Sequence, residues 1–166
     1  PPDGSGPTLN LNGQGQQAVW MGGESQLPYT WIGSAKGSVT GGSGQMALAV
    51  HQASATGAQA YHGSEAGARD LSVPFLRQGV GGWNSSLTVQ NVGTSNAQVS
   101  VHFYSSSGRE VSSYGPFTLS AGHSRVLYVE LPAGTSSAWV HSTGADVVAV
   151  VQQNHTDGRA MGYAGP

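Results

Sequence analysis

The six histidines and eight carboxylates of this chain are the side chains that could bind a metal ion or transfer a proton. The histidines are dispersed, and they form neither a His-x-His nor a His-Glu-x-x-His pattern. His155 and Asp157 lie close together in a predicted turn, but the sequence offers no third ligand for a zinc ion beside them. We therefore expect no metal site, and we expect the histidines to lie exposed or at an interface.

Nucleophile and cofactor motifs are missing as well. The chain has no cysteine, which excludes disulfides, thiolate zinc sites and cysteine nucleophiles, and it has no Gly-x-Ser-x-Gly elbow that would expose a serine. The segment Gly13-Gln-Gly-Gln-Gln-Ala18 partly matches a dinucleotide fingerprint, but neither a following helix nor a βαβ unit is predicted around it. The sequence thus predicts no catalytic residue and no cofactor, and the protein is not expected to be an enzyme.

Aromatic side chains are the better candidates for a ligand contact, because their faces stack on the rings of sugars. Trp83 follows Gly81-Gly82 at the mouth of a predicted loop, which makes it the best candidate among the tryptophans for an exposed contact, although a structural role is the stronger interpretation of the aromatic residues as a group. Trp31 and Trp139 stand beside β-branched residues, and we expect both of them in the core.

The composition is that of a weakly charged, glycine-rich chain. Charged residues make up 8% of the sequence, against about a quarter in a usual globular protein, and the formal net charge is -2. No basic field exists to attract nucleic acid or anionic lipid, and no apolar run approaches the roughly 20 residues of a membrane-spanning helix. This composition favours an exported or assembling β protein, so we expect an extracellular or cell-surface location. Two asparagines fit the N-glycosylation pattern, which matters only in a cell that glycosylates its surface proteins: Asn84 and Asn154.

Strands rather than helices are predicted throughout. Short alternating runs separated by turn residues are frequent, whereas no convincing apolar stripe of helical spacing occurs. Ser86–Asn91 and Gln98–Tyr104 alternate cleanly, and Val147–Gln152 is apolar on both faces, as a central strand can be. The spacing predicts an antiparallel β-sandwich of about seven or eight strands, with the long Ser106–Pro116 connection crossing between the sheets. Further strands are expected at Arg125–Val129, Ala138–His141 and Arg159–Tyr163.

The chain also echoes itself. Ala47–Gly57 resembles Val148–Gly158, because each reads as an apolar strand, glutamine, a short polar turn and glycine. A fixed period indicates one structural unit used repeatedly, here of about 100 residues. We expect a partial β-sandwich repeat over residues 1–68, which upstream sequence, a specialised N-terminal variant or a neighbouring molecule must complete, and a complete repeat over residues 69–166. The strands of the partial repeat are expected near Pro7–Leu11, Gln17–Met21, Tyr29–Ser34, Gln45–Gln52 and Gln59–Tyr61.

Several segments of the second unit together form a recognisable pattern: Val73-Pro-Phe-Leu76, Gly82–Gly93, Val99–Tyr104, Leu119-Ser-Ala-Gly122, Leu131-Pro-Ala-Gly134 and Val148–Gln152. The pattern resembles tandem repeats in secreted surface proteins of filamentous bacteria, and the resemblance covers roughly Leu71–Gly165. Those repeats are similar to immunoglobulin-like and fibronectin-like sandwiches and usually carry no catalytic residues. The resemblance therefore implies an Ig-like β-sandwich with a structural or adhesive role.

From these features we predict a non-enzymatic extracellular structural protein, a subunit of a cell-surface filament or fibre. An open sheet edge would accept a strand from a neighbour, so the expected partner is a second copy of the chain or a neighbouring repeat. The segment Val73–Leu76 is expected to be an edge strand, because Pro74 cannot donate to a ladder. The segment Pro1–Pro7 is one candidate donor arm, and Val73–Leu76 is one candidate acceptor. The residues expected to make assembly or ligand contacts are Pro7, Leu9, Leu11, Val73, Phe75 and Trp83.

An alternative prediction is a binding module, of the carbohydrate-binding or adhesin type, within a larger secreted surface protein. In that case the glycan-binding face is expected near Trp83. Nucleic acid and membrane insertion are not expected in either case, since the chain lacks the charge for the first and the apolar run for the second.

Overall fold

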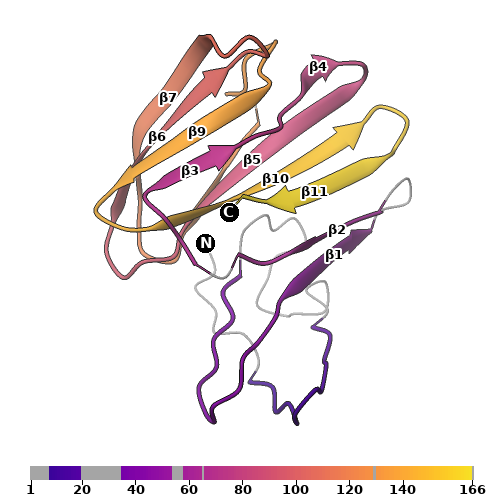
Figure 1. Cartoon of the computed structure of the whole chain (residues 1–166), viewed down its shortest axis with the longest axis vertical. Helices are drawn as coiled ribbons and strands as arrows, with labels where there is room; N and C mark the ends of the chain where they lie inside the picture. The colour runs from indigo at the N-terminus through magenta and orange to yellow at the C-terminus, as the bar shows by residue number, and fades with distance from the viewer. Residues whose placement is uncertain (1–7, 20–34, 54–57, 65, 129, 166) are drawn as a thin grey trace. The chain divides into compact units, whose positions relative to one another are not determined.

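The computed structural model describes residues 8–19, 35–53, 58–64, 66–128 and 130–165 (Figure 1). The chain divides into a smaller unit, Pro1–Ile32 with Val39–Met46, and a larger unit, Gly33–Ser38 with Ala47–Pro166. This division differs from the predicted boundary after residue 68, because a hairpin at residues 49–62 lies in the larger unit. All strand pairs are antiparallel and no helix occurs in the described ranges, so the prediction of an antiparallel all-β fold is confirmed.

One layer of the larger unit is a five-stranded sheet. Its long central strands, β5 (Trp83–Asn91) and β10 (Val147–His155), pair along their whole length. Strand β11 (Ala160–Ala164) adds to the other side of β10. Two short strands, β4 (Gln78–Val80) and β8 (Ser124–Leu127), pair with different parts of β5. The pairing therefore surrounds β5 and β10 with partners on both sides.

The second layer is a four-stranded sheet in the order β3-β9-β6-β7 (Figure 1). Its strands are β3 (Asp70–Val73), β9 (Ser137–Thr143), β6 (Ala97–Tyr104) and β7 (Glu110–Leu119). Strand β3 lies at an edge and pairs only with β9, but it ends at Val73. The predicted edge strand at Val73–Leu76 is therefore wrong after Val73, because the chain from Pro74 leaves this sheet for the other one and forms no strand before Gln78.

The two sheets enclose one hydrophobic core. In β6, Val99, Val101 and Phe103 are fully buried while the residues between them are partly exposed, as their alternation predicts. Strand β10 is apolar on both faces, as predicted: Val147, Ala149 and Val151 face the core, and Val148 is also buried. Each large apolar side chain removed from water in this way contributes about 1.5–3 kcal/mol to folding.

The prediction that Ser106–Pro116 crosses between the sheets is wrong. This segment turns back at Ser105–Arg109, where the Ser105 amide donates to the Arg109 carbonyl at 2.9 Å, and continues as β7 beside β6 in the same sheet. The ladder shifts register twice along β7. The side chains that pack on the core are therefore spaced irregularly, at Val111, Tyr114, Phe117 and Leu119. A period of two cannot be read from such a strand.

The sequence echo has a counterpart in two hairpins of the larger unit. Strands β1 (Ala49–Ala53) and β2 (Ala58–His62) pair in a two-stranded sheet, and β10 pairs with β11 in the same antiparallel way. Val50 lies opposite Tyr61, and Val151 lies opposite Tyr163. Both hairpins thus pair a valine with a tyrosine, although the second connection is one residue longer, and the repeat organisation of the whole chain stays a prediction.

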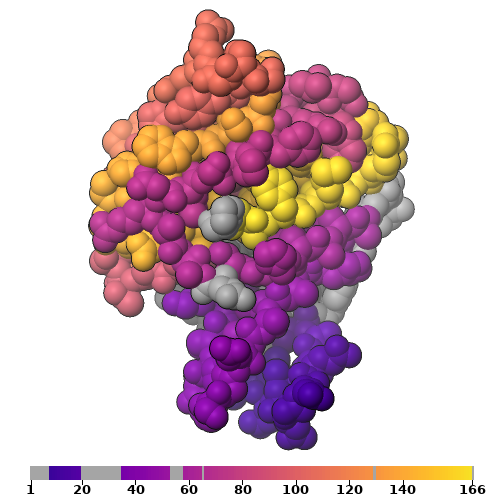
Figure 2. Space-filling model, in the orientation of Figure 1, coloured from indigo at the N-terminus to yellow at the C-terminus, as the bar shows by residue number. Residues whose placement is uncertain are grey.

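Hairpin β1–β2 lies against the outer surface of strands β10 and β11 (Figure 2). The Gln52 side-chain oxygen accepts from the Gln152 amide at 2.9 Å, and also from the Gln59 amide of β2 at 2.9 Å. The Tyr61 ring covers Gly162, where an added Cβ would meet it at 3.2 Å. A glycine at that position therefore permits the close approach of the two hairpins.

The remaining predictions for the first half of the chain had mixed outcomes. The predicted strands at Gln45–Gln52 and Gln59–Tyr61 correspond to β1 and β2. Residues 8–11 and 17–19 are described and form no strand, so those two predictions are wrong there. The predicted strand at Tyr29–Ser34 lies outside the described residues.

Candidate functional site

Trp139 lies on the outer face of the four-stranded sheet. Its neighbours in β9, Ala138 and Val140, point into the core, and the alternation of the strand turns Trp139 outward with 40% of its surface exposed. The prediction that Trp139 belongs to the core is therefore wrong. Trp31, which was also predicted to belong to the core, lies outside the described residues.

Two histidine rings flank Trp139 on the same face. His102 of β6 lies directly opposite Trp139 in the ladder, and their ring centroids are 5.7 Å apart at an interplanar angle of 35°. His141 follows two positions later in β9, with its centroid 5.6 Å from that of Trp139 at 39°. The sheet therefore assembles three neighbouring rings on one surface, from residues that are distant in sequence. These two histidines face outward, as predicted, but they are half-buried, with side chains that are 29% and 42% exposed.

A carboxylate orients each of the two imidazoles. Asp70, the first residue of β3, places Oδ1 2.8 Å from Nδ1 of His141, and Glu110, the first residue of β7, places Oε1 3.1 Å from Nδ1 of His102. A carboxylate accepts only, so each neutral imidazole carries its proton on Nδ1 and leaves Nε2 as an acceptor. Both pairs are solvent-accessible, so we assign them a positioning role and little stability.

Small polar side chains complete this surface. Ser72 of β3 lies opposite Trp139, and Ser100 of β6 lies opposite His141. We call Asp70, Ser72, Ser100, His102, Glu110, Trp139 and His141 together the tryptophan face. It offers a flat apolar ring surrounded by hydrogen-bonding groups, which is the arrangement that a sugar ring requires: an aromatic surface for its C–H face and polar partners for its hydroxyls.

Trp83, the predicted ligand contact, lies in a different and more enclosed place. Its side chain is half-buried, and the guanidinium carbons of Arg77 and Arg159 lie 5.4 Å and 5.6 Å from the centroid of its ring. The His155 ring meets it edge-on at 5.0 Å and 66°. These contacts already occupy much of the indole surface, so Trp83 is less available to a ligand than Trp139 is.

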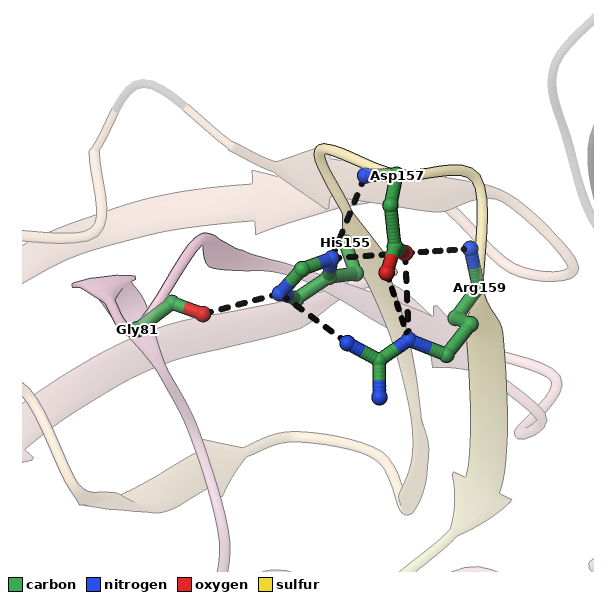
Figure 3. Close-up of polar contacts among 4 residues, drawn as sticks. All are labelled: Gly81, His155, Asp157 and Arg159. Carbon is green, nitrogen blue, oxygen red and sulfur yellow. Dashed lines mark hydrogen bonds and ion pairs between the residues drawn. The ribbon is translucent and has the colours of Figure 1, made fainter.

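The turn after β10 joins three of the polar side chains near Trp83 (Figure 3). His155 Nδ1 lies 2.6 Å from Asp157 Oδ1, and His155 Nε2 lies 2.9 Å from the Gly81 carbonyl oxygen. Arg159 Nε donates to Asp157 Oδ2 at 2.8 Å. The backbone amide of Arg159 is the main cause that holds the pKa of Asp157 below its ordinary value, with smaller contributions from His155 and the Arg159 side chain. His155 and Asp157 are therefore in contact, but their polar atoms already form hydrogen bonds that hold the turn after β10 against the turn at Gly81.

The predicted assembly residues are dispersed. Pro7 lies outside the described residues, and Leu9 and Leu11 belong to the smaller unit, where Leu11 is exposed. Val73 is fully buried in the core, so its side chain cannot contact a partner. Phe75 has an exposed side chain, over which the Arg77 guanidinium carbon lies 4.6 Å from the ring centroid.

The two predicted glycosylation positions are neighbours. Asn84 and Asn154 lie directly opposite each other in the β5–β10 ladder. Asn84 is half-buried and its side-chain oxygen accepts from the Gly79 amide at 3.2 Å, whereas Asn154 is exposed. Side chains opposite each other in a ladder are about 5 Å apart, so two glycans would compete for the same space.

Within the described parts of the chain, no group of three or more histidines and carboxylates could hold a metal ion. No helix in the same parts is long and apolar enough to cross a membrane. No protein-family model and no curated protein matches the chain.

Several solved structures, including the following two, resemble part of the chain. The crystal structure of Thermotoga maritima 1070 has a TM-score of 0.47 and 19% sequence identity over 60% of this chain and 94% of that one. The Anabaena sensory rhodopsin transducer has a TM-score of 0.37 and 18% identity over 52% of this chain and 97% of that one.

Proposed function

We propose that the protein is an extracellular carbohydrate-binding module and that a glycan binds to the tryptophan face. The observation that carries this proposal is the exposed Trp139 ring between two imidazoles, each oriented by a carboxylate. A pyranose ring would stack on the indole, and its hydroxyls would donate to the Nε2 atoms of His102 and His141. The alternative prediction expected a glycan-binding face near Trp83, whereas we propose that this face surrounds Trp139.

Rigid strands position every group of this face. Trp139 and His141 come from the central strand β9, His102 from the central strand β6, and the two carboxylates from the strands on either side. A preformed flat surface loses little conformational entropy when it binds. It would suit one face of an extended polysaccharide chain.

The test is calorimetric titration of the full chain with neutral oligosaccharides, such as hexamers of glucose and N-acetylglucosamine. Replacement Trp139→Ala should weaken binding by about tenfold or more, because a central aromatic anchor usually dominates an interface. Tyr128→Ala is the matched control, since Tyr128 is an equally exposed aromatic residue at the end of β8. Equal effects of the two replacements, or no binding at all, would overturn the proposal.

A filament subunit remains the second candidate, and hairpin β1–β2 favours it. This hairpin resembles β10–β11 in sequence, yet β10 pairs with β5 on its other side, whereas β1 has no second strand partner among the described residues. A strand from a neighbouring molecule could occupy that edge, and head-to-tail repetition would give a fibre. Negative-stain microscopy with light scattering tests this, and deletion of residues 1–12 should abolish fibres if that segment is the donor arm.

A further inference from the structure

The tryptophan face has an unbalanced charge. Its two carboxylates, Asp70 and Glu110, have side chains that are 55% and 46% exposed. The strands β3, β6, β7 and β9 that form the sheet contain no lysine and no arginine. A ligand that lies on this sheet therefore meets two negative charges and no cationic side chain from its four strands.

The free oxygens of the carboxylates are placed to act on a ligand. Each carboxylate uses one oxygen on an imidazole, and no other partner of Asp70 Oδ2 or Glu110 Oε2 occurs among the described residues. The indole between them has a negative quadrupole over its face, which attracts an ammonium group. The aromatic ring and the carboxylates thus favour the same kind of ligand, and both repel an anion.

We propose that the tryptophan face selects glycans that carry protonated amino groups, such as glucosamine polymers, over uronate or sulfated glycans. This inference rests on the proposed function, because it specifies the ligand of the same face. The sugar ring would stack on Trp139, and its 2-ammonium group would donate to Asp70 or Glu110. A sugar fits the site better than a basic peptide does, because Ser72 and Ser100 keep the surface around Trp139 low and open to a flat ring.

The experiment compares three hexamers on the full chain by calorimetry: glucosamine, N-acetylglucosamine and galacturonate, at a pH where the glucosamine amine is protonated. We expect the glucosamine hexamer to bind about three- to tenfold more tightly than its acetylated form, the size of effect that exposed ion pairs produce, and the galacturonate hexamer not to bind. The preference should shrink as salt is added, because the charges are exposed.

The double variant Asp70→Asn, Glu110→Gln should lose this preference and bind the amino and acetylated hexamers with equal affinity. Asp146→Asn is the matched control, since Asp146 is a similarly exposed, ion-paired carboxylate outside the tryptophan face. Equal binding of the amino and acetylated hexamers by the native chain overturns the inference and leaves the proposed function standing. So does binding of galacturonate, or equally tight binding of a lysine oligomer. Failure of all three hexamers to bind overturns the proposed function as well.

Discussion

The hydroxyl group of Tyr163 binds both polar groups of the Phe75 backbone, 88 residues earlier in the chain. It donates to the Phe75 carbonyl oxygen and accepts from the Phe75 amide at 3.1 Å. The same carbonyl also accepts from Nε2 of the buried Gln153 at 3.2 Å. Strand β11 therefore fastens the segment that passes from one sheet to the other between β3 and β4. Because its backbone groups are already bonded, Phe75 offers little to an added strand, whereas one edge of β1 has no strand partner among the described residues.

Replacement Tyr163→Phe should lower the free energy of unfolding by about 1–2 kcal/mol. The change leaves the Phe75 amide without its partner, whereas the Phe75 carbonyl keeps the hydrogen bond from Gln153. Urea unfolding followed by tryptophan fluorescence measures the loss. Tyr128→Phe is the control, because the exposed Tyr128 side chain should tolerate the change within about 0.5 kcal/mol. If both variants unfold at the same urea concentration, the Tyr163 hydroxyl does not hold the segment in place.

Alkaline pH should destabilise the larger unit through two tyrosines. Burial raises the pKa of Tyr61 and of Tyr163 above the ordinary value of 10.0, although the hydrogen bond with Phe75 offsets part of the rise at Tyr163. The native state then holds these protons more tightly than the unfolded state does. Their contribution to stability is complete below pH 10 and is lost as the pH rises through the folded pKa values. Urea unfolding between pH 8 and about 11 should show the decline.

The double variant Tyr61→Phe, Tyr163→Phe separates this effect from other alkaline changes. Phenylalanine cannot ionise, so the decline in unfolding free energy above pH 10 should become shallower in the variant. In an absorbance titration, the phenolate that forms at the highest pH in the native protein should be absent from the same variant. An unchanged slope in both measurements would mean that neither hydroxyl is buried enough to matter.

The position of Trp139 shows where sequence reasoning failed and why. Ala138, Trp139 and Val140 are all apolar, so the residues alone do not decide which of them face the core. The deciding signal was nearby: His141 was expected to point outward, and it shares its side of the strand with Trp139. Period-two alternation was reliable wherever a strand had a regular ladder, as in β6, and it failed in β7, where the register shifts.

Long-range pairing could not be predicted in the same way. The carboxylate of Asp70 reaches His141 across 71 residues, because β3 and β9 lie side by side. Nothing in the sequence near either residue indicates that pairing, and the order of strands in the sheet decides it. The sequence could therefore predict the outward orientation of His102 and His141, while their grouping around one indole required the structure.

The pKa of Asp157 should lie below 3.8, the ordinary value for its side chain, in the native protein. The backbone amide of Arg159 donates to Asp157 Oδ1 at 3.1 Å, and His155 and the Arg159 side chain add to this stabilisation of the charged form. A depressed folded pKa contributes stability that is present above the unfolded value and is lost as the pH falls through the folded value. Carbon NMR of the carboxyl group during an acid titration measures the midpoint.

Replacement Arg159→Gln tests the assignment of causes at Asp157. The variant keeps the backbone amide, which is the largest cause, so the midpoint should rise only part of the way to 3.8. Arg109→Gln should leave it unchanged, because Arg109 lies in the distant turn between β6 and β7. A full return to 3.8 after Arg159→Gln would mean that the guanidinium, and not the amide, is the main cause.

Gly115, the glycine of the irregular strand β7, should tolerate replacement poorly. Its φ is 115°, and an added Cβ would lie 2.6 Å from the Val99 carbonyl oxygen and 3.1 Å from the Ser100 Cα. Both obstacles are backbone atoms of the central strand β6, which cannot move without breaking the ladder. Gly115→Ala should therefore cost about 2–4 kcal/mol of unfolding free energy, the sum of an unfavourable φ and a steric overlap.

Gly108→Ala isolates the conformational part of this cost. Gly108 has a φ of 78° in the turn that precedes β7, and nothing lies within 4 Å of an added Cβ there. It should lose only about 1 kcal/mol, the cost of a left-handed conformation for alanine. The difference between the two variants in urea unfolding then measures how closely β7 approaches β6 at its register shift. Equal losses would show that β6 and β7 can separate at this point, and that the sheet that carries the tryptophan face deforms easily at the register shift.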